Sequence, residues 1–202
     1  MIIQKDINRK VEHRKFFIGA HPIIQVFMER LRVREIISSV IKQDMRLQVP
    51  VEQTLGIMIH NILTSPTTLY EIEDWLAPID SAALGIDNPD LIQDDRLGKS
   101  LESFYHGKHK EVFFRLALRA IKEFNLDCSR MHQDTTTITF TGKYSNWTAT
   151  EQLAFGKNKD HRPDLKQLVL GLSVTGDGAV PLVHKIYNGN QSDYTLHTEN
   201  HQ

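Results

Sequence analysis

The 202-residue sequence has one cysteine, two tryptophans and no long uninterrupted apolar run. A lone cysteine, Cys128, rules out an intramolecular disulfide and argues against a cysteine-based zinc site, so we expect it to be a small buried apolar side chain. No stretch approaches the roughly 20 apolar residues of a membrane helix. The first 15 residues are basic but are not followed by the apolar run of a secretory signal. These absences exclude a membrane protein, and the expected compartment is the cytoplasm.

Charge is present in ordinary amount but is unevenly distributed. Hydrophobic residues make up 40% and charged residues 24% of the chain, which is typical of a soluble globular protein. The net charge is −1, yet residues 1–50 carry ten Lys or Arg against five Asp or Glu, and residues 66–102 carry nine acids against two bases. A basic leading segment suits binding to DNA phosphates. A solvated basic helix face is the alternative, and charge alone leaves it open.

Residues 1–126 are predicted to form a helical domain, because their apolar residues recur at helical spacing. Pro22 suits a first helical turn, Pro50 precedes a helix, and Ser65-Pro66 ends it. Further helices are predicted over residues 69–76, 97–105 and 111–124. The apolar stripes, which are expected to pack on each other, are Ile23, Ile24, Phe27 and Leu31; Ile36, Ile37, Val40 and Ile41; Leu55, Met58, Ile59, Ile62 and Leu63; and Val112, Phe113, Leu116, Ala117, Ala120 and Ile121.

Residues 127–202 are predicted to form a second domain built on strands. Residues 129–140 alternate and are rich in threonine, and residues 168–174 and 180–187 form two further strands joined by an Asp177-Gly178 hairpin turn. The polar stretch 142–166 is predicted to be a long surface loop. Since no apolar run follows the third strand, no helix is expected to cover the sheet, and the domain looks incomplete. The fold class is therefore α+β.

Asp134 is the main candidate for chemistry. It lies inside a predicted strand, where aspartate is disfavoured, so metal ligation is one explanation and a strand-end structural role is the other. The spacings His106-x-x-His109 and His132-x-Asp134 could hold zinc, although solvated or core histidines explain them as well. Basic residues of the predicted loop, which could contact phosphates or be solvated, are Lys157, Lys159, Arg162 and Lys166.

Three sequence pieces in this order carry a family resemblance. They are Asp94-Asp95-Arg96-Leu97-Gly98-Lys99, then Gln133-Asp134-Thr135-Thr136, then the stretch from Tyr187 to Asp193. From about His21 onward the chain resembles the front half of bacterial DDE-type insertion-sequence transposases. More narrowly, it is similar to the subgroup in the superfamily of insertion sequence four that has an N-terminal helical domain of unknown function.

The resemblance implies a ribonuclease-H-like catalytic core, of which this chain would hold the first three strands. Asp134 would be the first acid of the Asp, Asp, Glu set that holds two Mg²⁺ ions for DNA strand cleavage and transfer. The second Asp and the Glu have no counterpart in this chain, and Asp193 falls in a turn instead. The expected function is therefore that of a truncated transposase, inactive alone, whose partners are insertion-sequence ends and either itself or full-length transposase.

Other functions remain open from the sequence. The chain could be a non-catalytic DNA-binding or regulatory fragment, a nonfunctional remnant of an insertion sequence, or a metal-dependent nuclease whose remaining acids come from another chain. Specific binding to element ends without strand transfer favours the regulatory interpretation. A cooperative thermal transition is incompatible with an unfolded remnant.

Overall fold

A computed structural model describes residues 15–43, 48–86, 88–142, 153–156 and 162–190. The chain divides into two compact units, Met1–Val112 and Phe113–Gln202, which are described separately below. The first unit is helical and the second contains an antiparallel sheet, so the α+β class is confirmed. In the described part of the chain, no helix combines the length and the apolar character that a membrane crossing requires.

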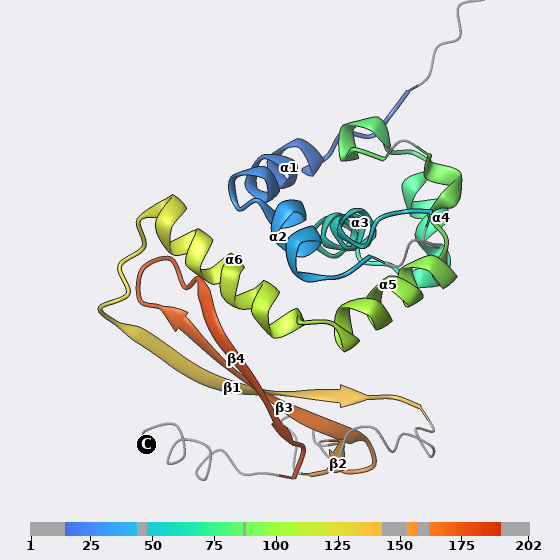
Figure 1. The fold of residues 1–202 in the computed structure, drawn as a ribbon. Helices are drawn as coiled ribbons and strands as arrows, with labels where there is room; N and C mark the ends of the chain where they lie inside the picture. Colours follow the sequence, from blue (N-terminus) through green and yellow to red (C-terminus); the bar gives the residue numbers. More distant parts are fainter. Residues whose placement is uncertain (1–14, 44–47, 87, 143–152, 157–161, 191–202) are drawn as a thin grey trace, which may run out of the picture. The chain divides into compact units, whose positions relative to one another are not determined.

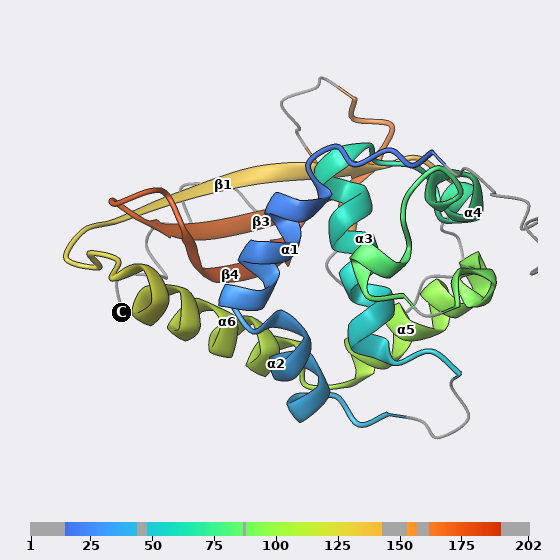
Figure 2. The same cartoon turned by 90° about the horizontal axis from the view of Figure 1, so that it is seen from above.

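The first unit, here called the helical unit, is a small bundle around α3 (Figure 1). Pro22 lies in the first turn of its first helix, Pro50 is the N-cap of α3, and Ser65 ends α3, as the sequence predicts. Figure 2 shows α3 between α1 and α2 on one side and α5 on the other. Its elements are α1 (His21–Arg30), α2 (Val33–Val40), α3 (Val51–Thr64), η1 (Leu69–Glu71), α4 (Ile72–Leu76), η2 (Ala82–Leu84), η3 (Pro89–Leu91) and α5 (Asp94–His106).

The core of the helical unit gathers around α3, whose Val51 and Ile57 are fully buried. Ile72 of α4, Leu97 of α5 and Ile92, which directly follows η3, are buried in the same core. Eight of the fourteen residues of α3 are buried, because this helix has neighbours on several sides rather than on one.

One predicted stripe is wrong in its orientation, and a second is wrong at its C-terminal end. α1 forms, but Ile23 is 63% and Phe27 47% exposed, and its buried residues are His21 and Met28. Likewise, Ile62 and Leu63 at the end of α3 are more than 60% exposed. Apolar spacing identified these helices correctly but did not reveal which face is buried, because α3 packs against the His21 and Met28 side.

Helix α6 (His109–Phe124) begins in the first unit and continues into the second from Phe113 onward. The second unit, here called the sheet unit, contains this part of α6 and four strands. The strands are β1 (Met131–Phe140), β2 (Ala154–Phe155), β3 (Lys166–Thr175) and β4 (Pro181–Asn188). β3 is central and pairs antiparallel with β1 along its whole length, and with β4 and β2 at its other edge. The three predicted strands and the hairpin are confirmed, and β2 is a short strand inside the stretch predicted to be a loop.

The two faces of the sheet differ. Antiparallel register places Asp134, Leu172 and His184 in one row across β1, β3 and β4. The Phe113 ring of α6 contacts the His184 ring edge-on, with centroids 4.5 Å apart, so α6 lies on this face. The expectation of a sheet without a covering helix is therefore wrong: the helix before the first strand covers it, and Ala117 and Ala120 of α6 are buried.

On the opposite face, Val169 and Tyr187 form a small buried cluster. Tyr187 lies over Gly171, where an added Cβ would come within 2.9 Å of the tyrosine ring. Cys128, expected to be buried, is instead exposed in the segment before β1. It lies in the short connection between α6 and the sheet, outside both cores.

Candidate functional site

Asp134 occupies the middle of β1, as the sequence predicts, and its side chain is exposed. Its backbone is held by the full β1–β3 ladder, opposite Leu172. One carboxylate oxygen, Oδ1, accepts a hydrogen bond of 2.7 Å from the backbone N–H of Thr135. The second oxygen has no hydrogen-bond donor among the described residues. A strand that is paired along its whole length therefore presents an accessible carboxylate, which is what a metal ligand requires.

The surroundings of Asp134 are poor in other metal ligands. Among the described residues, no three or more His, Cys, Asp or Glu side chains come together. Within the described strands, Asp134 is the single acid on its sheet face. The other titratable residues on this face are His132, Lys166 and His184. One carboxylate does not organise two metal ions. The residues described here thus do not fit a two-metal centre, and no cleavage step follows from them.

The basic residues predicted near phosphates have different positions. Lys157 and Lys159 lie outside the described residues. Arg162 donates two hydrogen bonds to Asp164, of 2.8 and 2.7 Å, which raise the pKa of Arg162 and lower that of Asp164. Lys166 is not in a loop as predicted, because it is the first residue of β3, and its Nζ lies 6.0 Å from the centre of the Phe155 ring.

The sequence pieces that carry the resemblance have structural roles as well. Asp94 and Asp95 lie in the first turn of α5, where negative charge is favourable, and Leu97 is fully buried. Gly189 follows β4 and leaves no room for a side chain, because an added Cβ would overlap the Gln167 carbonyl oxygen. The side-chain amide of Gln167 donates a 2.6 Å hydrogen bond to the Gly189 carbonyl. Asp193 lies outside the described residues.

A second group of polar residues, not found from the sequence, lies inside the helical unit. His21 at the start of α1 and His60 on α3 are 4% and 0% exposed, and their Nδ1 atoms are 3.2 Å apart. His60 Nε2 lies 3.4 Å from Gln25 Oε1. The Gln25 amide in turn donates to Glu29 Oε1 at 2.9 Å, which fixes its orientation. Four side chains thus form a continuous hydrogen-bonded chain from the surface to a buried histidine pair.

Burial sets the charge state of this histidine pair. Desolvation lowers the pKa of His60 from 6.5 to about 4, and charge repulsion from His21 and from the Arg34 guanidinium adds to the shift. Desolvation also lowers the pKa of His21. Both imidazoles are therefore neutral at neutral pH, and each has one N–H and one bare nitrogen.

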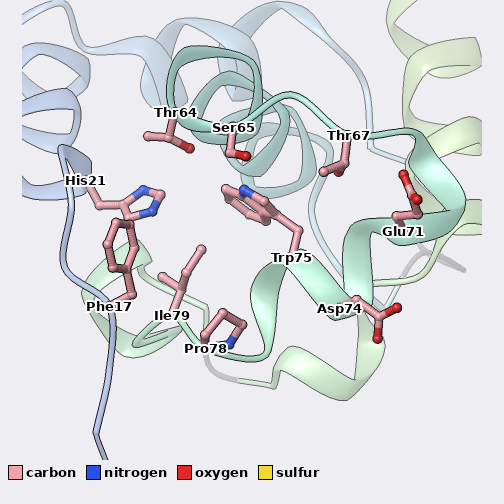
Figure 3. A pocket seen from close by; sticks show the side chains of 10 residues that line it. All are labelled: Phe17, His21, Thr64, Ser65, Thr67, Glu71, Asp74, Trp75, Pro78 and Ile79. Carbon is pink, nitrogen blue, oxygen red and sulfur yellow. The ribbon is translucent and has the colours of Figure 1, made fainter.

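His21 also lines a cavity of about 540 Å³ (Figure 3). Trp75 forms one wall of this cavity, and its indole ring packs edge-on against the His21 ring with the centroids 5.7 Å apart. Phe17 is placed at the cavity by an isolated β-bridge between its backbone and that of Ile79. Among the residues that the structure describes, the lining includes no lysine or arginine; it consists of Phe17, His21, Thr64, Ser65, Thr67, Glu71, Asp74, Trp75, Pro78 and Ile79.

Sequence reasoning missed this site because its parts are far apart along the chain. His21 and His60 are separated by 39 positions, and neither belongs to a recognisable ligand spacing. The usable signal was a histidine directly after the apolar residues Ile57, Met58 and Ile59 of α3, which indicates a polar residue close to the core that needs a partner.

The fold and these sites define an α+β protein in which a helical unit with an internal cavity precedes an antiparallel sheet. The family model of the domain of unknown function DUF4277 matches residues 15–118, which is more than half of the chain. The chain belongs to this family, and the domain is known from transposase-like proteins. The matched residues include the whole cavity lining and the histidine pair. Neither curated proteins nor solved structures gave a match.

Proposed function

We propose that this protein is a DDE-type insertion-sequence transposase of the subgroup with an N-terminal helical domain. Its sheet would be part of a ribonuclease-H-like core, and Asp134 would be the first metal-binding carboxylate. The observation that carries the proposal is the position of Asp134, which is exposed in the interior of the first strand after a DUF4277 domain. The three long strands, which pair in chain order, support it.

Asp134 would serve as a hard oxygen ligand for Mg²⁺, which usually binds proteins through one or two carboxylates and keeps several waters. Mg²⁺, when bound by a complete set of carboxylates, activates the attacking oxygen and stabilises the leaving one. This chain's own contribution is a carboxylate that the β1–β3 ladder holds in place. Because no second carboxylate accompanies it among the described residues, we expect weak metal binding and no strand cleavage by the chain alone.

Metal binding at Asp134 is testable with Mn²⁺ as a paramagnetic probe for Mg²⁺. We expect Mn²⁺ to broaden the amide signals of residues around Asp134 first, and excess Mg²⁺ to reverse the effect. Asp134→Asn should abolish this broadening, whereas Asp177→Asn, an exposed aspartate in the β3–β4 turn, should leave it unchanged. Broadening that is equal in the Asp134→Asn variant would contradict the assignment.

Catalysis is tested separately with supercoiled plasmid DNA and Mg²⁺. The expected result for the purified chain is no conversion to nicked circles. Nicking that depends on Mg²⁺ and disappears in Asp134→Ala would overturn the expectation of inactivity while strengthening the family assignment. Nicking that survives in Asp134→Ala would indicate a contaminating nuclease or a different active site.

A non-catalytic DNA-binding function is the second proposal, and the basic excess of residues 1–50 favours it. Binding through phosphates weakens steeply with salt, because each neutralised phosphate releases counterions. We expect binding of a labelled duplex, followed by fluorescence anisotropy, to weaken as salt is raised from 50 to 200 mM. Arg162→Ala should have little effect, since its guanidinium is held by Asp164. Absence of binding at 50 mM salt would eliminate this function.

A further inference from the structure

The tautomers of the buried histidines follow from the hydrogen-bonded chain. The Gln25 amide nitrogen donates to Glu29, so its oxygen faces His60 and must accept from His60 Nε2–H. A neutral His60 with hydrogen on Nε2 has a bare Nδ1, which therefore accepts from His21 Nδ1–H. This leaves the second nitrogen of His21, Nε2, without a hydrogen.

The bare nitrogen of His21 is accessible from the cavity. His21 Nε2 has no hydrogen-bond partner among the described residues. It is also not fully enclosed, because the enclosed side-chain atoms without a partner among the described residues are Arg34 Nε and Gln167 Oε1. His21 lines the cavity, with the indole of Trp75 at its edge (Figure 3). The cavity thus offers a hydrogen-bond acceptor whose direction is fixed by three further side chains.

The remaining walls select for shape and charge. The Phe17 and Trp75 rings with Ile79 give an apolar lining suited to a flat ring. Glu71 and Asp74 are the charged lining residues, and both are acidic. Figure 3 shows their carboxylates on the side of the cavity away from His21. A phosphate or carboxylate would be repelled there, whereas a positive charge would be attracted.

We propose that this cavity binds a small aromatic cation, whose ring lies among Phe17, Trp75 and Ile79 and donates an N–H to His21 Nε2. The positive group of the ligand lies toward Glu71 and Asp74. A volume of about 540 Å³ is within the range of sites for small organic ligands. The site is independent of the proposed transposase chemistry, because all of its residues belong to the helical unit.

Tryptamine is a suitable probe, because it combines an indole N–H with an ammonium group. We expect saturable binding by isothermal titration calorimetry at pH 7.5. 1-Methyltryptamine lacks the ring N–H and should bind about tenfold more weakly, the effect of one unmade hydrogen bond. Indole-3-acetate, which keeps the ring but carries a negative charge, should bind most weakly. Equal binding of tryptamine and 1-methyltryptamine would overturn the role of His21.

Variants separate the two parts of the site. His21→Phe should remove the preference for tryptamine over 1-methyltryptamine, and Asp74→Asn should reduce the preference for tryptamine over indole-3-acetate. Glu73→Gln is the matched control, because Glu73 precedes Asp74 on α4 and does not line this cavity. Unchanged selectivity in Asp74→Asn would contradict the charge argument.

A measurement on the unaltered protein keeps the proposal testable if His21→Phe fails to fold. With ¹⁵N-labelled histidine, long-range proton–nitrogen spectra should show hydrogen on His21 Nδ1 and on His60 Nε2. Tryptamine should shift the resonance of His21 Nε2 and leave that of His60 Nε2 nearly unchanged. Hydrogen found on His21 Nε2, or no shift with saturating tryptamine, would refute the proposed acceptor.

Discussion

Seventeen apolar side chains are buried in the described part of the helical unit, whereas four are buried in that of the sheet unit, two of them alanines of α6. The helical unit buries large apolar residues from α1, α2, α4 and α5 around α3. The sheet unit depends more on backbone pairing along β3 and on single contacts such as Tyr187 over Gly171. From this difference we expect the helical unit to be the more stable of the two and the sheet that carries Asp134 to be the less stable.

The largest expected loss of stability comes from truncating a core side chain of the helical unit. Leu97→Ala should destabilise the helical unit by about 2–5 kcal/mol, because Leu97 is fully buried and a cavity remains. Leu101→Ala, one turn later on α5 at a residue 39% exposed, should cost less than about 1 kcal/mol. Urea unfolding followed by hydrogen exchange of peptides from each unit measures both. Equal effects of the two variants would contradict the proposed core.

Lowering the pH should reduce the stability of the helical unit through His60, which is the next largest expected effect. The folded-state pKa of His60, about 4, lies below its ordinary value of 6.5, so the unfolded chain binds the proton first as pH falls. The helical unit should lose roughly 3 kcal/mol between pH 6.5 and pH 4, and below that the folded state also takes up the proton. The groups facing His60 are His21, Gln25 and Arg34, and none provides a carboxylate.

Unfolding midpoints measured across this pH range check the prediction, and an NMR titration of His60 measures its pKa directly. His60→Asn should flatten the pH dependence of the helical unit. A His60 pKa near 6.5 in the folded protein would show that the pair is not desolvated.

Gly189→Ala should destabilise the sheet unit where β4 ends. A Cβ at this position would overlap the Gln167 carbonyl oxygen and lie 2.8 Å from the Ala154 carbonyl oxygen. We expect a loss of about 1–3 kcal/mol, the usual cost of overpacking, and faster hydrogen exchange in β2 and the first residues of β3. Exchange in the helical unit should not change, and a uniform effect across both units would contradict their separation.

Gly98→Ala is the matched glycine substitution in the stronger unit and should have the smallest effect. An added Cβ meets no heavy atom within 4 Å on α5. Alanine is favoured over glycine in a helix interior, so the helical unit should gain about 0.5–1 kcal/mol. A loss of stability, measured by urea unfolding, would show that the Asp94–Lys99 segment has a neighbour that the described residues do not include.

Much of the fold could be predicted because its signals are local. Helical spacing, Pro22, Pro50 and Ser65-Pro66 located helices, and alternation with the Asp177-Gly178 turn located strands. The buried face of α1 could not be predicted, because Ile23 and Phe27 have the right spacing but α3 contacts the other side. The covering role of α6 was missed for a related reason: the helix precedes the strands that it covers.

The candidate sites divide in the same way. Residue periodicity alone placed Asp134 inside a strand and located the change from helices to strands before it. Strand pairing was needed to show that Asp134 shares its face with His184 and lacks a second carboxylate among the described residues. Tertiary structure also joined His21 to His60 across 39 positions, because burial and hydrogen bonding depend on which helices meet, and periodicity within one helix does not encode its neighbour.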